Sequence, residues 1–454
     1  MREPAMPARR LRRRPAAAAV SAAVALALVL AGCGGGSGGG GASGGATGDP
    51  AAVQAALDQP AEITFWTWVP HIDKTVARFQ AKYPKVKVNV VNVGQSQDQY
   101  TKLTNALKAG DGAPDVAQIE YSALPQFALT KSLVDLAGYG VGDLKDQFAP
   151  SAWSQVNVAG GIYGVPQDTG PMVMYYRKDI FAKAGVTPPK TWEEFTVAAK
   201  RIREADPSVY MTFADPSDAG SATGLMWQLG GKPFTVNGTD VAVNLRGDSG
   251  AKAYADLLGP LIKDKLVDGN ASFTSEWFQS IVAGKYAVWM AGAWAPAVLD
   301  QYLPTGKGQW SVAPMPGGVS AENGGSAVAV TAQARNKAAS VAFTRWLNAD
   351  PEAVKSLNSE AGLFPATKAL LADPAFRDAE LPYFPGEKPN AVFADMSKAV
   401  RPDWQYLPYQ PYADSIFKDT LGQALKNGTD LNAGLAAWQE RLKTYGKEQG
   451  FTVK

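Results

Sequence analysis

The stretch GIYGVPQDTGPMVMYYRKDIFAKAGVTPPKTWEEF, which spans residues 161–195, decides how the rest of the chain is interpreted. It contains two short apolar runs, residues 160–166 and residues 172–176, each bounded by glycine, proline or charged residues, and each therefore predicts a strand. Thr191 then precedes a helical pattern and is followed three residues later by Glu194, which is the spacing of a capping box. We expect Thr191 to cap a helix that runs to about residue 204, with Glu194 reaching back to the Thr191 amide.

Alternating strand and helix patterns precede this stretch. Strand patterns cover residues 62–68, 86–91 and 113–119, and helix patterns cover residues 72–82 and the region around residues 100–107. Strands that alternate with helices form parallel βαβ units, so the chain is predicted to have an α/β fold with an open sheet. Ligands of such sheets bind outside the carboxyl ends of the strands.

The pattern continues after the stretch. A helix is predicted over residues 251–267, with an interruption at Gly259–Pro260, and a strand over residues 286–290. A further strand is predicted over residues 327–331 and a helix over residues 337–347. With 454 residues and a hydrophobic content of 46%, the chain is long enough for two domains with substantial cores.

The N-terminus has the composition of a targeting segment. Six arginines and one glutamate lie in residues 1–32, so the net charge of +2 becomes −3 for the remainder, which has no basic patch suited to nucleic acid. An alanine-rich segment then leads to Leu30-Ala31-Gly32-Cys33, which predicts a lipoprotein signal peptide over residues 1–32 with Cys33 as the lipid attachment point. A transmembrane helix or an ordinary secretory signal is the alternative, but the apolar run is shorter than the ~20 residues needed to span a membrane. Residues 33–58 are predicted to form a Gly-rich flexible tether.

Several short motifs occur in order along the chain. They are Ala113-Pro114-Asp115-Val116, Leu133-Val134-Asp135-Leu136, the run from Gly284-Lys285 to Trp294, and Gly362-Leu363-Phe364-Pro365. Together with the opening stretch, they resemble the family 1 extracellular solute-binding proteins of bacterial ABC sugar importers, which include the maltose-binding proteins. The resemblance extends from Ile63 to about Pro365.

The resemblance implies a periplasmic-binding-protein type II-like fold, with two discontinuous α/β lobes, a hinge and a ligand cleft between the lobes. Lobe 1 would comprise residues 59–166 and 312–348, and lobe 2 residues 167–311 and 349–454, with crossings near Pro166, Pro314 and Asn348. It also implies a lipid-anchored, extracytoplasmic monomer that captures a carbohydrate by lobe closure and delivers it to the permease subunits of an ABC importer.

Candidate ligand-binding residues follow from strand ends and from the motifs, because sugars stack on aromatic rings and hydrogen-bond to amides and carboxylates. Trp66, Trp68, Gln118, Glu120 and Tyr121 lie at the ends of predicted strands, although core packing would also explain one of the two tryptophans. The remaining candidates lie elsewhere in the chain: Asp168 at the crossing, Gly325 in a Gly-Gly-Ser run, Trp294, and the second-lobe aromatics Trp227 and Trp404. Trp294 matches, by its position in the motif, a tryptophan that stacks on sugar in maltose-binding relatives. Asp168 would serve equally as a turn residue, and the glycine run as a simple turn.

Other kinds of chemistry lack the necessary residues. His71 is the only histidine and Cys33 the only cysteine, so metal clusters, cofactor-ligating clusters and histidine-based catalytic triads are not expected. Two alternatives stay open: a solute-binding protein for a polyamine or an organophosphate, and a secreted carbohydrate-active enzyme with two carboxylates beside its ligand. A polyamine would need several carboxylates in the cleft, and a phosphate would need Arg or Lys. Neither cluster is visible at the predicted strand ends.

Overall fold

A computed structural model describes residues 48–454. The predicted signal peptide, Cys33 and residues 33–47 of the predicted tether lie outside the described residues. The last part of the predicted tether is not flexible chain: residues 50–56 form helix α1, whose Val53 is buried. None of the helices within residues 48–454 is both long enough and apolar enough to cross a membrane.

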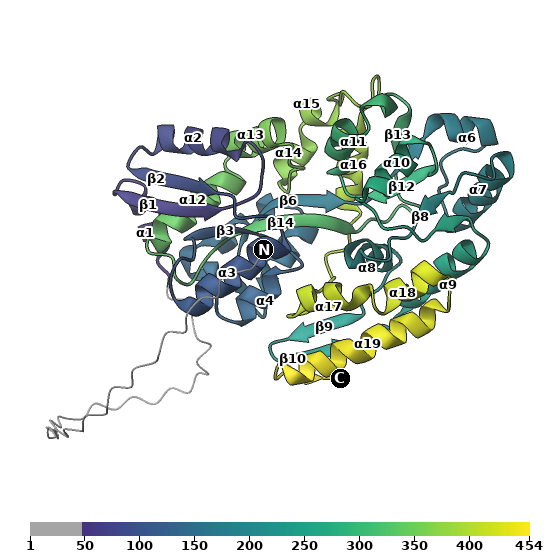
Figure 1. The fold of residues 1–454 in the computed structure, drawn as a ribbon. Helices are drawn as coiled ribbons and strands as arrows, with labels where there is room; N and C mark the ends of the chain where they lie inside the picture. Colours follow the sequence, from purple (N-terminus) through teal and green to yellow (C-terminus); the bar gives the residue numbers. More distant parts are fainter. Residues whose placement is uncertain (1–47) are drawn as a thin grey trace, which may run out of the picture. The chain divides into compact units, whose positions relative to one another are not determined.

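Five strands form the first sheet, in the order β2-β1-β3-β14-β6 (Figure 1). β1 (Ala61–Trp66) pairs in parallel with β2 (Val86–Val91) and β3 (Val116–Glu120). β14 (Glu322–Val330) pairs antiparallel with β3 on one side and with β6 (Val165–Pro171) on the other. The predicted α/β class with an open sheet is therefore observed, and the bounds of β2 are those expected from its sequence pattern.

The Asp115 carboxylate connects β1, β3 and the segment before α12 (Lys337–Ala349) through hydrogen bonds. Asp115 is 3% exposed, and its two oxygens accept hydrogen bonds from the Thr64 amide at 2.9 Å and the Arg335 amide at 2.8 Å. Because buried amides need partners, this one carboxylate fixes the start of β3 relative to the middle of β1 and to the residues before α12. The Ala-Pro-Asp-Val motif thus has a structural role.

Helices pack beside this sheet. Those described in its vicinity are α1 (Pro50–Ala56), α2 (Ile72–Lys82), α3 (Gln97–Ala109), α4 (Leu124–Leu129), η1 (Leu136–Tyr139), η2 (Val141–Gln147), α5 (Pro150–Gln155), α12 (Lys337–Ala349), α13 (Pro351–Ala361), α14 (Lys368–Ala372) and α15 (Pro374–Arg377). α2 contacts both α12 and α13, and α1 contacts α12. The apolar face of α2 places Ile72, Val76 and Phe79 in the core, as the helical spacing predicts.

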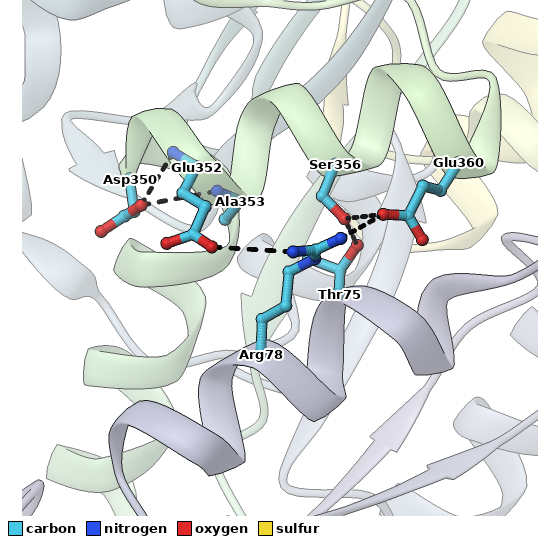
Figure 2. A network of polar contacts seen from close by, with 7 residues as sticks. All are labelled: Thr75, Arg78, Asp350, Glu352, Ala353, Ser356 and Glu360. Atoms are coloured by element: carbon cyan, nitrogen blue, oxygen red, sulfur yellow. Dashed lines mark hydrogen bonds and ion pairs between the residues drawn. The ribbon is translucent and has the colours of Figure 1, made fainter.

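Polar contacts fasten α2 to α13 (Figure 2). The hydroxyls of Thr75 and Ser356 lie 2.7 Å apart and are buried. Outside them, the Arg78 guanidinium reaches Glu360 at 2.6 Å and Glu352 at 3.7 Å. The hydroxyl pair excludes water at the centre of the contact, whereas the ion pairs remain at its exposed rim, where they contribute less.

The second sheet is antiparallel, in the order β12-β7-β13, formed by β12 (Val288–Ala291), β7 (Val173–Arg177) and β13 (Trp310–Ala313). Val173 and Tyr175 belong to one cluster of buried apolar side chains, and Met172 and Met174 to the other. Successive side chains of a strand face opposite sides, so a strand buried on both faces has a continuous apolar sequence, as this run does. Only Met172 separates β6 in the first sheet from β7 in the second.

The remaining elements are short strands and helices. The short strands are β4 (Asn157–Val158), β5 (Gly161–Ile162), β8 (Thr212–Phe213), β9 (Phe234–Asn237), β10 (Asp240–Val243), β11 (Val267–Asp268) and β15 (Thr452–Val453). Of these, β4 and β5 pack against η1, α4 and α5 beside the first sheet. The helices are α6 (Lys178–Ala184), α7 (Trp192–Ala205), α8 (Ala219–Gln228), α9 (Ser249–Lys263), α10 (Ser275–Val282), α11 (Ala295–Tyr302), η3 (Pro304–Gly306), α16 (Pro389–Lys398), α17 (Gln410–Phe417), α18 (Leu421–Asn427) and α19 (Leu431–Glu448).

Two helix predictions have informative outcomes. Thr191 caps α7, since its hydroxyl accepts from the Glu194 amide at 3.2 Å, but the Glu194 carboxylate accepts from the Lys190 amide and not from Thr191.

The predicted interruption at Gly259–Pro260 is wrong, because α9 continues through Pro260. Pro260 and Asp256, the residue whose carbonyl loses its usual donor, are both exposed, so water can satisfy that carbonyl.

Candidate functional site

A cavity of about 860 Å³ lies at the carboxyl end of β3 and beside β6 and β14. Four aromatic side chains line it: Trp68, Phe273, Trp294 and Tyr406. Five carboxyl groups line it as well: Glu120, Asp168, Asp218, Glu322 and Asp414. The lining includes several amides and hydroxyls, and no Lys, Arg or His is among its lining residues within 48–454. The position agrees with the general rule for ligand sites in open α/β sheets.

Gln118 is fixed by a chain of buried hydrogen bonds. Its Oε1 accepts from the Thr67 hydroxyl at 2.7 Å and from the Trp68 amide at 3.2 Å, and its Nε2 donates to the Ser326 hydroxyl at 3.3 Å. The side chain thereby links the end of β1, β3 and β14. Trp68 is held by the same contacts and by an edge-to-face contact with Tyr100, so its ring is positioned before any ligand arrives.

The carboxylate and the backbone amide of Glu120 both form hydrogen bonds with the hydroxyl of Tyr100. Tyr100 Oη donates to the Glu120 carboxylate at 2.8 Å and accepts from the Glu120 amide at 2.9 Å. Burial raises the pKa of Glu120, and the hydrogen bonds from Tyr100 and Ser96 oppose that change. The carboxylate therefore faces the cavity in a fixed orientation, without a cationic partner.

Asp168 and Glu322 stand on neighbouring strands, β6 and β14. The Ser326 amide donates to Asp168 Oδ1 at 2.9 Å, and the Gly170 amide donates to Glu322 Oε2 at 2.8 Å. Burial raises the pKa of Asp168 and of Glu322 to about 7 each; repulsion by Glu120 adds to the rise at Asp168, and repulsion by Asp168 adds to the rise at Glu322. At neutral pH these groups are partly protonated, so they can both accept and donate hydrogen bonds.

The Gly-Gly-Ser run lies inside β14 and does not form a separate turn. Gly324 and Gly325 have φ values of +94° and +98° at an irregularity in the pairing of β14 with β6. A Cβ on Gly325 would lie 2.8 Å from the Tyr121 ring, so only glycine fits. Tyr121 does not line the cavity; it supports the cavity from behind by donating its hydroxyl to the Asp168 carbonyl at 2.9 Å.

Trp294 is anchored by its indole nitrogen, which donates to the Asn323 carbonyl at 2.7 Å. Its ring packs against two aromatic neighbours, with Trp289 at 5.6 Å and Phe273 at 6.2 Å between ring centroids. Because the side chain remains only partly buried, part of the ring is available to the cavity.

The structure brings six of the sequence-predicted candidates to the cavity: Trp68, Gln118, Glu120, Asp168, Trp294 and Gly325. Trp66, Tyr121, Trp227 and Trp404 do not line it. Trp227 and Trp404 stack on each other at 5.3 Å with an interplanar angle of 10°, and Trp227 donates to the Arg401 carbonyl, so this pair packs in the core. Tyr406, two residues beyond Trp404, is the aromatic of that segment that reaches the cavity.

Sequence reasoning missed Asp218, Phe273, Glu322, Asn323 and Asp414. Asp218 caps α8, accepting from the Ser221 amide at 3.1 Å. Asp414 lies on α17, where burial raises its pKa to about 7 and the Gln410 amide group donates to it at 2.9 Å. Only the Asp-x-x-Ser cap of α8 carried a local signal. No group of three or more metal-ligand side chains in the described part of the chain is placed to hold a metal ion.

Comparison with known proteins identifies relatives over most of the chain. A family model described as bacterial extracellular solute-binding protein matches residues 67–354. An arabinooligosaccharide-binding protein of Bacillus subtilis (strain 168) is 26% identical over 391 residues, covering 81% of this chain and 88% of the relative. A lactose-binding protein of Rhizobium radiobacter is 25% identical, covering 74% of this chain and 81% of the relative.

Solved structures agree in fold. The ABC transporter associated binding protein from B. animalis subsp. lactis Bl-04, in complex with beta-1,6-galactobiose, is 39% identical with a TM-score of 0.75, covering 87% of this chain and all of that one. The galacto-N-biose-/lacto-N-biose I-binding protein from Bifidobacterium longum is 28% identical with a TM-score of 0.76, covering 87% of this chain and 99% of that one. The predicted type II periplasmic-binding fold is confirmed, and the chain belongs to the family of bacterial extracellular solute-binding proteins.

Proposed function

We propose that this protein is the extracytoplasmic component of an ABC importer that captures a carbohydrate and delivers it to the membrane permease. The observation that carries the proposal is the 860 Å³ cavity, in which aromatic rings alternate with carboxyl and amide groups. Rings such as Trp68 and Trp294 offer flat apolar faces to the C–H faces of a sugar. Gln118, Asn323 and the carboxyl groups offer hydrogen bonds to its hydroxyls.

Similarity supports the same substrate class. The relatives named above include proteins described as binding arabinooligosaccharide, lactose and beta-1,6-galactobiose. A cavity of this volume is large enough for a ligand of several tens of atoms, so we propose an oligosaccharide, not a single sugar.

The two-lobed organisation, with residues 59–166 and 312–348 in lobe 1 and residues 167–311 and 349–454 in lobe 2, belongs to the proposal. So do the attachment of a lipid to Cys33 and a monomeric state. Under this proposal the crossing strands β6 and β14 form part of the hinge, and closure of the lobes around the ligand produces the form that the permease recognises.

A polyamine is the second candidate ligand, because five carboxyl groups line the cavity and none of its lining residues within 48–454 is basic. Three of these carboxyls, however, already have hydrogen-bond partners in the protein, which leaves fewer of their oxygens for a cation. Asp168, Glu322 and Asp218 each already accept hydrogen bonds from backbone amides. The same absence of basic lining residues disfavours an organophosphate.

Titration calorimetry on the purified protein tests the proposal, with mono- and oligosaccharides in one series and putrescine and spermidine in the other. We expect micromolar saccharide binding, and Trp294→Ala should weaken it by more than tenfold, or about 1.4 kcal/mol. Trp192→Ala is the matched control, because Trp192 is a partly buried tryptophan on α7 outside the cavity. Binding of polyamines without binding of any saccharide would show that the ligand is a polyamine and not a carbohydrate. An unchanged affinity in Trp294→Ala would remove that ring from the site.

A further inference from the structure

A second, smaller cavity of about 50 Å³ adjoins the large one. Asp218, Phe273, Trp294 and Asn323 line both, so these residues form the boundary between the two spaces. The small cavity extends from this boundary into the second sheet and between α8 and α9. It is therefore a side pocket of the proposed ligand site.

The floor of the side pocket is apolar. Met172, Ala222, Leu225, Leu258 and Met290 contribute carbon and sulfur atoms to it, and all but Met290 are nearly fully buried. One water needs roughly 10–15 Å³ of such accessible space, so a cavity of 50 Å³ has room for a few non-hydrogen atoms. A small group with one carbon and one oxygen fits that size.

One hydroxyl group of the side pocket has no hydrogen bond to another residue within 48–454. Tyr254 is 2% exposed and lines the pocket, and its hydroxyl forms no hydrogen bond with another residue of the part of the chain that the structure describes. The two nearby carboxylates are already committed. Asp215 accepts from the amides and hydroxyls of Ser217 and Ser272, and Asp218 accepts from Ser221. The Tyr254 hydroxyl therefore keeps its capacity to donate and accept for a group that a ligand brings into the pocket.

The rim of the side pocket is held in a strained conformation. Phe273 has a φ of +59°, which is unfavourable for a bulky residue, and it is 51% exposed. Its neighbours fix it there: the Asp215 carboxylate accepts from the Ser272 amide at 2.6 Å, and the Phe273 ring stacks on Trp277 at 5.2 Å. The positive φ of Phe273 is energetically unfavourable, and it keeps the aromatic side chain exposed at the boundary of the two cavities. We therefore expect this side chain to contact ligand.

We propose that the side pocket receives the exocyclic hydroxymethyl group of a hexopyranose unit whose ring lies in the large cavity. The inference rests on the proposed function and narrows it to saccharides with hexose units. The CH₂ packs against Ala222 and Leu225, the hydroxyl pairs with the Tyr254 hydroxyl, and Phe273 and Trp294 flank the entrance. A pentopyranose has no hydroxymethyl group, so it leaves the pocket unfilled and Tyr254 unpaired. Sites that hydrogen-bond a ligand hydroxyl discriminate strongly against analogues that lack it.

Matched saccharide pairs test the inference by titration calorimetry on the full chain. Cellobiose and xylobiose differ only in hydroxymethyl groups, as do β-1,6-galactobiose and its analogue with a terminal arabinopyranose. We expect at least one hexose member to bind more than tenfold tighter than its pentose partner. Ala222→Val, which adds two methyl groups to the pocket floor, should remove most of that difference by weakening hexose binding alone.

Tyr254→Phe provides a second variant that keeps the ring and removes only the hydroxyl. It should reduce the hexose preference severalfold without changing the affinity for the pentose partner. Tyr409→Phe is the control, because Tyr409 is also a buried tyrosine without a hydrogen-bond partner among residues 48–454, and it lines neither cavity. Equal binding of both members of every pair, or variants that weaken both members equally, would overturn the side-pocket assignment while leaving saccharide capture intact. Absence of binding by any saccharide would overturn the proposed function itself.

Discussion

Replacing Glu322 by glutamine is expected to stabilise the protein at alkaline pH and to change little near pH 5. Glu322 is 2% exposed, and its carboxylate accepts from the Ser151 hydroxyl at 3.0 Å and the Gly170 amide at 2.8 Å. Glutamine has the same shape and preserves both contacts, because its oxygen accepts from Gly170 while its NH₂ donates to the Ser151 hydroxyl. The substitution therefore removes a buried charge without opening a cavity.

The magnitude follows from the pKa of this carboxyl group. Burial raises the pKa of Glu322 from its ordinary value of 4.5 to about 7, and repulsion by Asp168 acts in the same direction. The folded protein holds the proton in a range where the unfolded chain has lost it, so the free energy of unfolding falls as pH rises from about 4.5 to about 7. At about 1.4 kcal/mol per pKa unit, the ionised carboxylate costs on the order of 3 kcal/mol above pH 7. Glutamine removes that cost.

Urea denaturation of the wild type and Glu322→Gln at about pH 5 and about pH 8.5 measures the effect. Glu448→Gln, at an exposed position of α19, controls for the loss of one negative charge. The wild type and Glu322→Gln should have nearly equal free energies of unfolding at the lower pH. At the higher pH, Glu322→Gln should be more stable by on the order of 3 kcal/mol. A difference that does not depend on pH, or that Glu448→Gln reproduces, would refute the reasoning.

Four further predictions concern the scaffold. Gly170→Ala should destabilise the protein by more than about 2 kcal/mol and lower the calorimetric Tm, because a Cβ there would lie 2.2 Å from the Asn323 carbonyl oxygen. Gly259→Ala should change the free energy of unfolding in urea by less than about 1 kcal/mol, because the gain in helix propensity is opposed by the clash of the new methyl with the following Pro260, while no atom beyond its chain neighbours and its own helix backbone lies within 4 Å. In the α2–α13 contact, Arg78→Ala should cost less than about 1 kcal/mol because its ion pairs are exposed. Ser356→Ala should cost about 1–3 kcal/mol by urea denaturation because it leaves the fully buried Thr75 hydroxyl without its partner.

Features with local causes were predicted well from the sequence. The bounds of α2 and β2 follow from spacing of 3.6 and from β-branched content, and the α7 cap follows from the position of Thr191. Trp68, Gln118 and Glu120 reach the cavity because strand ends determine where a ligand site lies in an open sheet. Asp168, which was predicted from its place at the crossing, reaches the cavity from within β6.

Features that depend on distant segments could not be predicted. Asp218, the N-cap of α8, and Asp414 on α17 are almost 200 residues apart in the chain, so neither local pattern indicated that both line one cavity. The start of β14 was also placed too late, since the glycines at 324 and 325 suggested a turn. In the structure they form an irregularity within the strand, and this irregularity brings Glu322 and Asn323 to the cavity.

Two of the cavity carboxyls, those of Asp168 and Glu322, form hydrogen bonds between the crossing strands β6 and β14. Asp168 on β6 accepts from a β14 amide, and Glu322 on β14 accepts from a β6 amide, so each strand provides a carboxyl that binds the backbone of the other. A ligand hydroxyl that approaches either carboxyl therefore competes with, or reinforces, a hydrogen bond that holds the two strands in register. If these strands form part of the hinge, as we propose, ligand recognition acts directly on the segment that moves and needs no relay through the cores. The same arrangement explains why two mutually repelling carboxyls occupy a buried position where apolar residues would give greater stability.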